Sequence, residues 1–156
     1  MRLSKSVRRS AGLAGAASCL ALLASPSFAA DAAHGAQVFK GTCGVCHLAQ
    51  PHPAVSDLAM RIGPNLWGVV NRPKASEAGF TYSDAIKSKG GNWTIDDLSA
   101  FLTNPRTFAP GTKMTFVGLP KGSERADVIA YLNSLSDNPA PLPKAAQNVP
   151  AGQKTQ

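Results

Sequence analysis

Residues 42–47 read "TCGVCH", two cysteines three positions apart with a histidine directly after the second. Thiols at this spacing serve three kinds of chemistry: a thiol–disulfide redox pair, half of a zinc site, or the attachment point of a haem. These sites differ in what else they require. The other possible ligands and the surrounding elements must therefore decide between them.

A redox pair and a zinc site both lack their usual surroundings here. A redox-active pair lies at the start of a helix that follows a strand, and the sequence has no strand-like alternation of useful length. A structural zinc ion takes four ligands, which could be assembled from Cys43, Cys46, His34 and either His47 or His52. No second ligand cluster supports that assembly, so a haem is the favoured interpretation.

Helical spacing supports the haem interpretation. Side chains three and four apart share a helix face, so Cys43, Cys46 and His47 can place two thioethers on a porphyrin edge and an imidazole at the iron. A second axial ligand could be His34, His52, Met60 or Met114. Met114 is favoured because it lies in "NPRTFAPGTKMTFVG", a loop stiffened by proline and glycine between two predicted helices.

The elements that must position these residues are helices and long loops. One short helix is expected over residues 31–40, directly before the motif. "TIDDLSAFLTNP" predicts a second, started by Thr94 and stopped by Asn104 with Pro105. A third, with apolar residues at helical spacing from Val128 on, is expected to be capped by Ser123.

Residues 48–92 are rich in proline, glycine, serine and asparagine. Their one helical signal is "SDAIKSKGG", where Ser83 can cap and Gly90 can end a short helix. So much loop in a small domain indicates that something other than the chain fills the core. The fold class expected is all-α with long loops.

The two ends of the chain are expected to lie outside the domain. Residues 1–30 have a cationic start, a 14-residue apolar run and small residues before Ala30, the pattern of a secretory signal peptide. The run is shorter than the roughly 20 residues of a membrane span; an uncleaved leader that anchors the protein, or lipidation at Cys19, is the alternative. Residues 138–156 are proline-rich with little apolar bulk and are expected to be a disordered tail.

Removing the leader changes the charge of the protein. The leader holds four of the 16 basic residues and none of the 9 acids, so cleavage lowers the formal net charge from +7 to +3. A nucleic-acid binder is therefore not expected. Cleavage also removes Cys19, which leaves Cys43 and Cys46 as the cysteines of an exported protein.

Residues 31–137 are expected to form one domain. From about Gly35 to Leu135 its sequence resembles class I c-type cytochromes, close to mitochondrial cytochrome c and its small bacterial relatives. The resemblance is carried, in family order, by "FKGTCGVCH", "GPNLWGVVNR", "GFTYSDA", "NWT", "LTNPRTFAPGTKMTF" and "ERADVIAYL". It implies the class I cytochrome c fold, with three main helices, short helices and long loops wrapped around one covalent haem c.

The resemblance also implies a role for each matched residue. Cys43 and Cys46 would form the thioethers, His47 and Met114 would be the axial ligands of the iron, and the Pro64 carbonyl would accept the other N–H of the ligand imidazole. The residues that would bind a buried haem propionate are Arg72, Tyr82 and Trp93. The residues that would form the crossing of the first and last helices are Gly35, Phe39, Val128 and Tyr131.

Three departures from the family pattern bear on the site. The loop "LAQPHPAVSDLAMRI" before Pro64 is several residues longer than in mitochondrial members. Phe101 stands where many relatives have tyrosine, and Ile86 where many have asparagine. Both replacements remove polar groups, so a drier haem pocket is expected.

The function implied is that of a monohaem electron carrier, not an enzyme, which shuttles single electrons from a quinol:cytochrome c oxidoreductase to a terminal oxidase or reductase. A haem peroxidase or small-molecule reductase with a labile distal methionine is the alternative, and a ligand-sensing haem protein a further one. The protein is expected to be a periplasmic monomer. Residues 32–56 and 98–123 hold basic residues and no acid, so membrane redox complexes with acidic docking patches, or periplasmic dehydrogenases, are the expected partners.

Overall fold

The computed structural model describes residues 30–142, so the predicted signal peptide and most of the predicted tail lie outside the described residues. In chain order the elements are α1 (Ala32–Val38), η1 (Phe39–Cys43), α2 (Val55–Ala59), α3 (Asp84–Lys87), α4 (Ile95–Thr103), α5 (Pro105–Phe108) and α6 (Gly122–Ser134). Within this range the β-structure is limited to an isolated bridge between Pro73 and Asn92. The expected all-α class with long loops is confirmed.

The predicted helix before the motif is present and changes pitch at its end. The Asp31 carboxylate accepts hydrogen bonds from the backbone N–H groups of Ala33 and His34 and so caps α1. At Phe39 the helix widens into the π-helical turn η1, which the Gly44 N–H closes on the Phe39 carbonyl at 2.8 Å. Such turns are rare and often lie at functional sites. This one ends at Cys43, the first cysteine of the motif.

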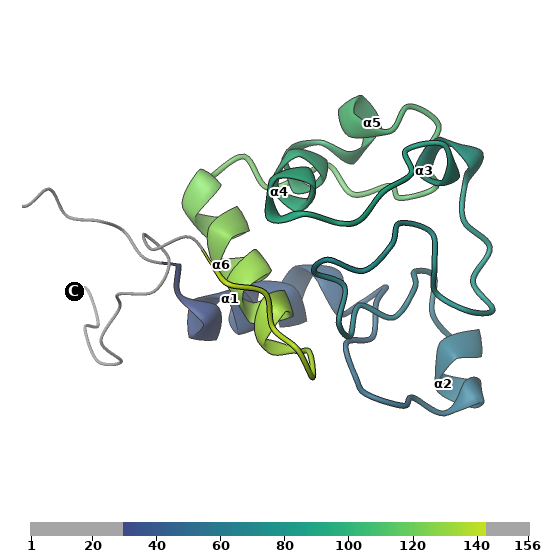
Figure 1. Ribbon diagram of the computed structural model, residues 1–156, viewed down its shortest axis with the longest axis horizontal. Helices are drawn as coiled ribbons and strands as arrows, with labels where there is room; N and C mark the ends of the chain where they lie inside the picture. Colours follow the sequence, from purple (N-terminus) through teal and green to yellow (C-terminus); the bar gives the residue numbers. More distant parts are fainter. Residues whose placement is uncertain (1–29, 143–156) are drawn as a thin grey trace, which may run out of the picture.

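Helices α1 and α6 cross at Gly35, as predicted (Figure 1). A Cβ at position 35 would lie 2.0 Å from the Asp127 carbonyl oxygen, so a side chain there would push the helices apart. Phe39 contacts Tyr131 with 5.4 Å between ring centroids, and Val128 is completely buried. Packing between the first and last helices therefore anchors one end of the domain.

Helix α4 packs against α6 and α5 (Figure 1). Its predicted start is confirmed, because the Thr94 hydroxyl accepts the Asp97 N–H at 3.0 Å. The predicted stop at Asn104 and Pro105 is confirmed, since α4 ends at Thr103; the Asn104 carboxamide then caps a new turn, α5, whose first residue is Pro105. Proline is tolerated at the first position of a helix, since its missing N–H has no intrahelical partner there.

The starts of α3 and α6 are capped in different ways. Ser83 caps α3 by accepting the Ile86 N–H, as predicted. The prediction that Ser123 caps α6 is wrong, because α6 begins at Gly122 with the extended residue Lys121 as its cap and no side-chain cap bond. The Arg125 guanidinium instead donates to the carbonyls of Leu119 and Pro120, and so fixes the chain just before α6 begins at Gly122.

The long loop region contains one helix that the sequence analysis missed, α2. It lies at the edge of the domain (Figure 1), and none of its residues is buried. At the other end of the chain, Ala140 exchanges two hydrogen bonds of 2.9 Å with the Asn133 carboxamide. The start of the predicted tail is thus held against α6.

Candidate functional site

The cysteine–histidine motif forms one compact turn after η1. The N–H groups of Cys46 and His47 both donate to the Cys43 carbonyl, at 3.0 and 2.9 Å. From the other side, Arg61 Nη1 donates to the Gly44 carbonyl at 2.7 Å and the Gly63 N–H donates to the Cys46 carbonyl at 3.0 Å. The three candidate side chains therefore come from a single turn that is clamped on both sides.

The surroundings of the Cys43 thiol do not suit a redox pair. Both cysteines are free and half-buried. Burial, with a smaller contribution from the neighbouring Cys46, raises the pKa of the Cys43 thiol to about 11. Redox-active pairs need a lowered thiol pKa, so the structure argues against that alternative. No group of three or more histidine, cysteine or acidic side chains within residues 30–142 could hold a metal ion, which argues against the zinc site.

The His47 imidazole is held in one orientation. Its Nδ1 lies 2.8 Å from the Pro64 carbonyl oxygen, the predicted contact, and because a carbonyl only accepts, Nδ1 carries the proton. Nε2 is then the nitrogen with a free lone pair. Burial lowers the pKa of the imidazole, against the opposing effect of the bond to Pro64, and so favours the neutral ring. A neutral, oriented imidazole is the form that binds a metal.

Three residues predicted to bind a propionate are brought together. The backbone N–H of Trp93 donates to the backbone carbonyl of Arg72 at 2.9 Å. Glu77 connects Arg72 to Tyr82. Arg72 Nη1 donates to Glu77 Oε2 at 3.1 Å, and the Glu77 backbone N–H donates to the Tyr82 hydroxyl oxygen at 3.3 Å. Burial raises the pKa of Tyr82 and keeps its hydroxyl protonated. Arg72 also donates to the carbonyls of Asn65 and Trp67, which fixes its guanidinium.

Met114 lies in the loop between α5 and α6 and is half-buried. The loop is tethered on both sides of Met114: Lys113 Nζ donates to the Thr81 carbonyl at 3.1 Å, and the Leu119 N–H donates to the Leu102 carbonyl at 2.7 Å. The structure thus presents Met114 from a tethered loop, while its role at an iron stays a prediction.

The other possible axial ligands lie elsewhere. His52 is exposed, and Met60 is 82% exposed. His34 Nδ1 lies 2.7 Å from Asp127 Oδ2 at the crossing of α1 and α6. The structure therefore gives each of these residues surroundings that do not suit an axial ligand.

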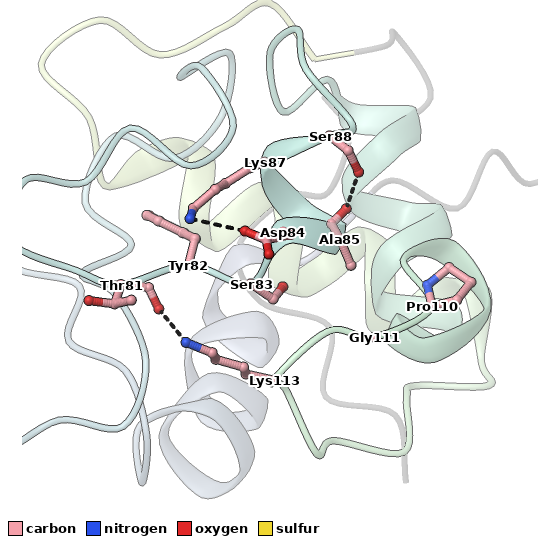
Figure 2. Close-up of a pocket in the computed structure, with 10 residues that line it drawn as sticks. All are labelled: Thr81, Tyr82, Ser83, Asp84, Ala85, Lys87, Ser88, Pro110, Gly111 and Lys113. Atoms are coloured by element: carbon pink, nitrogen blue, oxygen red, sulfur yellow. Dashed lines mark hydrogen bonds and ion pairs between the residues drawn. The ribbon is translucent and has the colours of Figure 1, made fainter.

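A cleft of about 730 Å³ opens between α3 and the start of the Met114 loop (Figure 2). Tyr82, Lys87 and Lys113 are among the residues that line it, and the bond from Lys113 to Thr81 crosses it in the close-up. The two cysteines, His47 and Met114 are not lining residues. The cleft therefore lies between residues 81–88 and residues 110–113, apart from the four candidate haem ligands.

The residues present fit a haem of the c type. The donor set combines two free thiols, a neutral imidazole with one free nitrogen and a half-buried thioether, and these are the groups that hold such a haem. The Gly63 backbone lies against the His47 ring so closely that a Cβ there would come within 2.3 Å of Cε1. Arg72, Tyr82 and Trp93 would hold a propionate of that haem.

Sequence reasoning missed several residues that shape this site. Gly63 could have been found, since it directly precedes the matched Pro64 and a glycine beside a ligand loop signals close approach. Arg61 and Glu77 carried no signal, because their partners at Gly44 and Arg72 are set by how the loops fold back.

None of the helices that the structure describes has the length and apolar character needed to cross a bilayer.

A model of the family described as cytochrome c matches residues 32–136. Among curated relatives, a cytochrome c homolog of Bradyrhizobium diazoefficiens is 53% identical over 67% of this chain and 55% of its own. The cytochrome c-type cyt cy of Rhodobacter capsulatus is 47% identical over 67% of this chain and 49% of its own. This chain thus spans about half the length of these two relatives.

Among solved structures, cytochrome cH from Methylobacterium extorquens matches with a TM-score of 0.58 and 35% identity, over 67% of this chain and 98% of that one. The matched family segment begins at the first residue of α1 and ends beyond α6. It therefore contains every element described above, and the chain belongs to the cytochrome c family.

Proposed function

We propose that this protein is a one-electron carrier with a single haem c bonded through Cys43 and Cys46. The observation that carries the proposal is the His47 imidazole, half-buried and held at 2.8 Å by the Pro64 carbonyl directly after the two free thiols. When bound, the haem supplies a one-electron couple between Fe(III) and Fe(II).

The chain's own residues would set the properties of that couple. The Pro64 carbonyl fixes the His47 ring and raises the basicity of its free nitrogen. Met114 would provide a soft thioether on the opposite side, which favours the reduced iron and raises the potential. Two protein ligands, His47 and Met114, would keep small molecules from the metal, and this would distinguish a carrier from a peroxidase or a reductase.

The partners we propose are membrane respiratory complexes, a quinol-oxidising donor and a terminal oxidase or reductase as acceptor, with periplasmic dehydrogenases as other possible donors. Exposed basic residues support an acidic docking surface on these partners. They are Lys40, Arg106, Lys113 and Lys121. We also propose export to the periplasm, for which the pattern of residues 1–30 is the support.

The experiment that tests the function is a visible spectrum of the purified full-length protein in both oxidation states, with haem staining after denaturing electrophoresis. A carrier is expected to give a low-spin spectrum in both states, haem that survives denaturation, and no turnover of peroxide. A high-spin oxidised spectrum together with peroxide turnover would favour the enzyme alternative. Absence of covalent haem would overturn the proposal.

A further inference from the structure

Lys74 has the environment of a buried structural cation. Its side chain is 5% exposed. Its ammonium reaches three oxygens: the Gly90 carbonyl at 3.0 Å, the Asn92 carbonyl at 2.6 Å and Asp97 Oδ2 at 2.7 Å. An ammonium has three N–H donors, and here each has an acceptor. Nζ also lies 5.3 Å from the centroid of the Trp93 ring, within the range of a cation–π contact.

The acceptors of Lys74 lie on the segment that pairs with its own. Across the Pro73–Asn92 bridge, the Asn71 N–H donates to the Trp93 carbonyl, the Trp93 N–H to the Arg72 carbonyl and the Lys74 N–H to the Gly91 carbonyl, each at 2.9 Å. This pairing, residues 71–74 with 91–93, is called the bridge segment below. It carries both Arg72 and Trp93.

The bridge segment needs support from outside its backbone. A two-stranded pair this short is marginal in water. Gly90 and Gly91 both have left-handed backbone conformations, with φ of +59° and +62°, and glycine is the most flexible residue. Pro73 has no N–H to donate. The ammonium of Lys74 joins the two sides and, through Asp97, ties them to the first turn of α4.

We infer that Lys74 is a positioning residue for the haem propionate: with Asp97 it fixes the bridge segment, and so holds Arg72 and Trp93 where they would bind the propionate and set the reduction potential. The inference rests on the proposed function, because it assumes a bound haem. Its physical basis is that loosened donors leave the ionised propionate less neutralised, and an unneutralised negative charge near the iron stabilises Fe(III) and lowers the potential.

A through-space effect of the Lys74 charge would also lower the potential on its removal, so the test must separate the two. Lys74 and Asp97 have opposite charges 2.7 Å apart, and removing both leaves the net charge unchanged. The variants are therefore Lys74→Met and the charge-conserving pair Lys74→Met with Asp97→Asn. The control is Lys87→Met, because Lys87 is an exposed lysine paired with the exposed Asp84 and lies outside the bridge segment.

The measurements are the midpoint potential of the haem-loaded full chain and the hydrogen exchange rate of the Trp93 amide. If Lys74 positions the donors, both test variants should lower the potential. Both should also speed the exchange of the Trp93 amide by about tenfold or more, because removing a hydrogen bond to a charged group destabilises the closed state by that factor. Lys87→Met should leave both near the parent values.

A parental potential and unchanged Trp93 exchange in the charge-conserving pair would overturn the inference, because charge alone would then explain the single variant. The parent is first shown to carry covalent, low-spin haem, so failure of the proposed function is recognised separately. If Lys74→Met does not accumulate, Lys74→Arg keeps the charge but replaces the compact ammonium with a rigid planar fork, whose N–H groups point in different directions. Unchanged exchange and potential in that variant would equally overturn the inference.

Discussion

The imidazole of His47 lies against the α-carbon of Gly63, with room for a hydrogen and no more. A Cβ at position 63 would lie 2.3 Å from Cε1, 2.6 Å from Nδ1 and 2.8 Å from Nε2 of the ring. The next residue, Pro64, accepts the Nδ1–H of the same ring. One dipeptide therefore both supports and orients the candidate iron ligand.

Gly63→Ala is expected to displace the His47 ring from the Pro64 carbonyl. Strain of this kind in a packed site costs about 1–3 kcal/mol, so the free energy of unfolding measured in urea should fall by that amount. The visible spectrum should also change, because the axial imidazole is reoriented.

Gly41→Ala is the matched control, since no atom lies within 4 Å of a Cβ at that exposed position in the same region. It should be neutral or slightly stabilising, because alanine restricts the unfolded chain more than glycine does. Equal urea midpoints for the two variants and the parent would show that the Gly63 contact is not important.

Local features of the sequence predicted the local features of the fold. The caps by Ser83 and Thr94 and the close approach at Gly35 were predictable because each depends on a residue and its near neighbours, or on a family motif. Ser123 looked like a cap for α6, but Arg125 holds the preceding carbonyls and starts the helix at Gly122. That arrangement depends on tertiary packing, which spacing alone does not reveal.

The candidate site was predictable where the family motif is dense. The contact of His47 with Pro64 and the grouping of Arg72 with Trp93 follow the resemblance. Helix α2 and the bonds of Lys74 did not, because the loop around α2 departs from the family and a single lysine in a polar stretch usually indicates a solvated surface. Long-range hydrogen bonds from flexible side chains leave no periodic signal.

The paired substitution Cys43→Ala with Cys46→Ala should abolish haem that survives denaturing electrophoresis. Both thiols are free, so no disulfide competes for them. Loss of haem should also reduce secondary structure, because residues 48–92 offer little apolar patterning to close a core by themselves. Haem staining and far-ultraviolet circular dichroism are the measurements. Haem stain retained in the double variant would contradict covalent attachment at these residues.

Met114→Ala should open one axial position of the iron. The expected results are a high-spin spectrum, a lower potential, since a soft ligand to Fe(II) is lost, and peroxidase activity that the parent lacks. Met60→Ala is the control, because the Met60 side chain lies on the exposed outer loop. A low-spin spectrum that survives Met114→Ala would mean that another residue occupies the distal position.

Asp127→Asn should weaken the crossing of α1 and α6. Asp127 Oδ1 accepts the Asp31 N–H at 2.7 Å and Oδ2 lies 2.7 Å from His34 Nδ1, so the buried carboxylate bonds to two partners, the cap and the first turn of α1. Breaking hydrogen bonds to a charged group costs about 1.5–3 kcal/mol, which urea unfolding would show as a lower midpoint with an unchanged slope. Asp137→Asn, at an exposed position, should leave the midpoint at the parent value; equal effects would refute the role.

Docking is expected to depend on the basic side chains of residues 98–123, a stretch with no acid. Lys113→Glu and Lys121→Glu should each slow the bimolecular reaction with the terminal oxidase of the host membrane at low ionic strength, by about two- to tenfold, since steering by opposite charges raises association rates. The spectrum and the potential should stay nearly unchanged. Stopped-flow oxidation over a range of salt is the measurement, and the effect should fade as the Debye length shrinks to about 3 Å near 1 M salt.

The two lysines should differ in size of effect. Lys121 Nζ lies 2.9 Å from Glu124 Oε1, so part of its field is cancelled, whereas Lys113 Nζ donates to the neutral Thr81 carbonyl and keeps its full charge. Lys113→Glu should therefore slow the reaction more than Lys121→Glu. The same reversal at Lys144 or Lys154, in the predicted tail, removes an equal charge far along the chain from the Met114 loop and should do much less. If the tail and loop variants behave alike, or if the rate does not respond to salt, the partner binds at another surface or through apolar contacts.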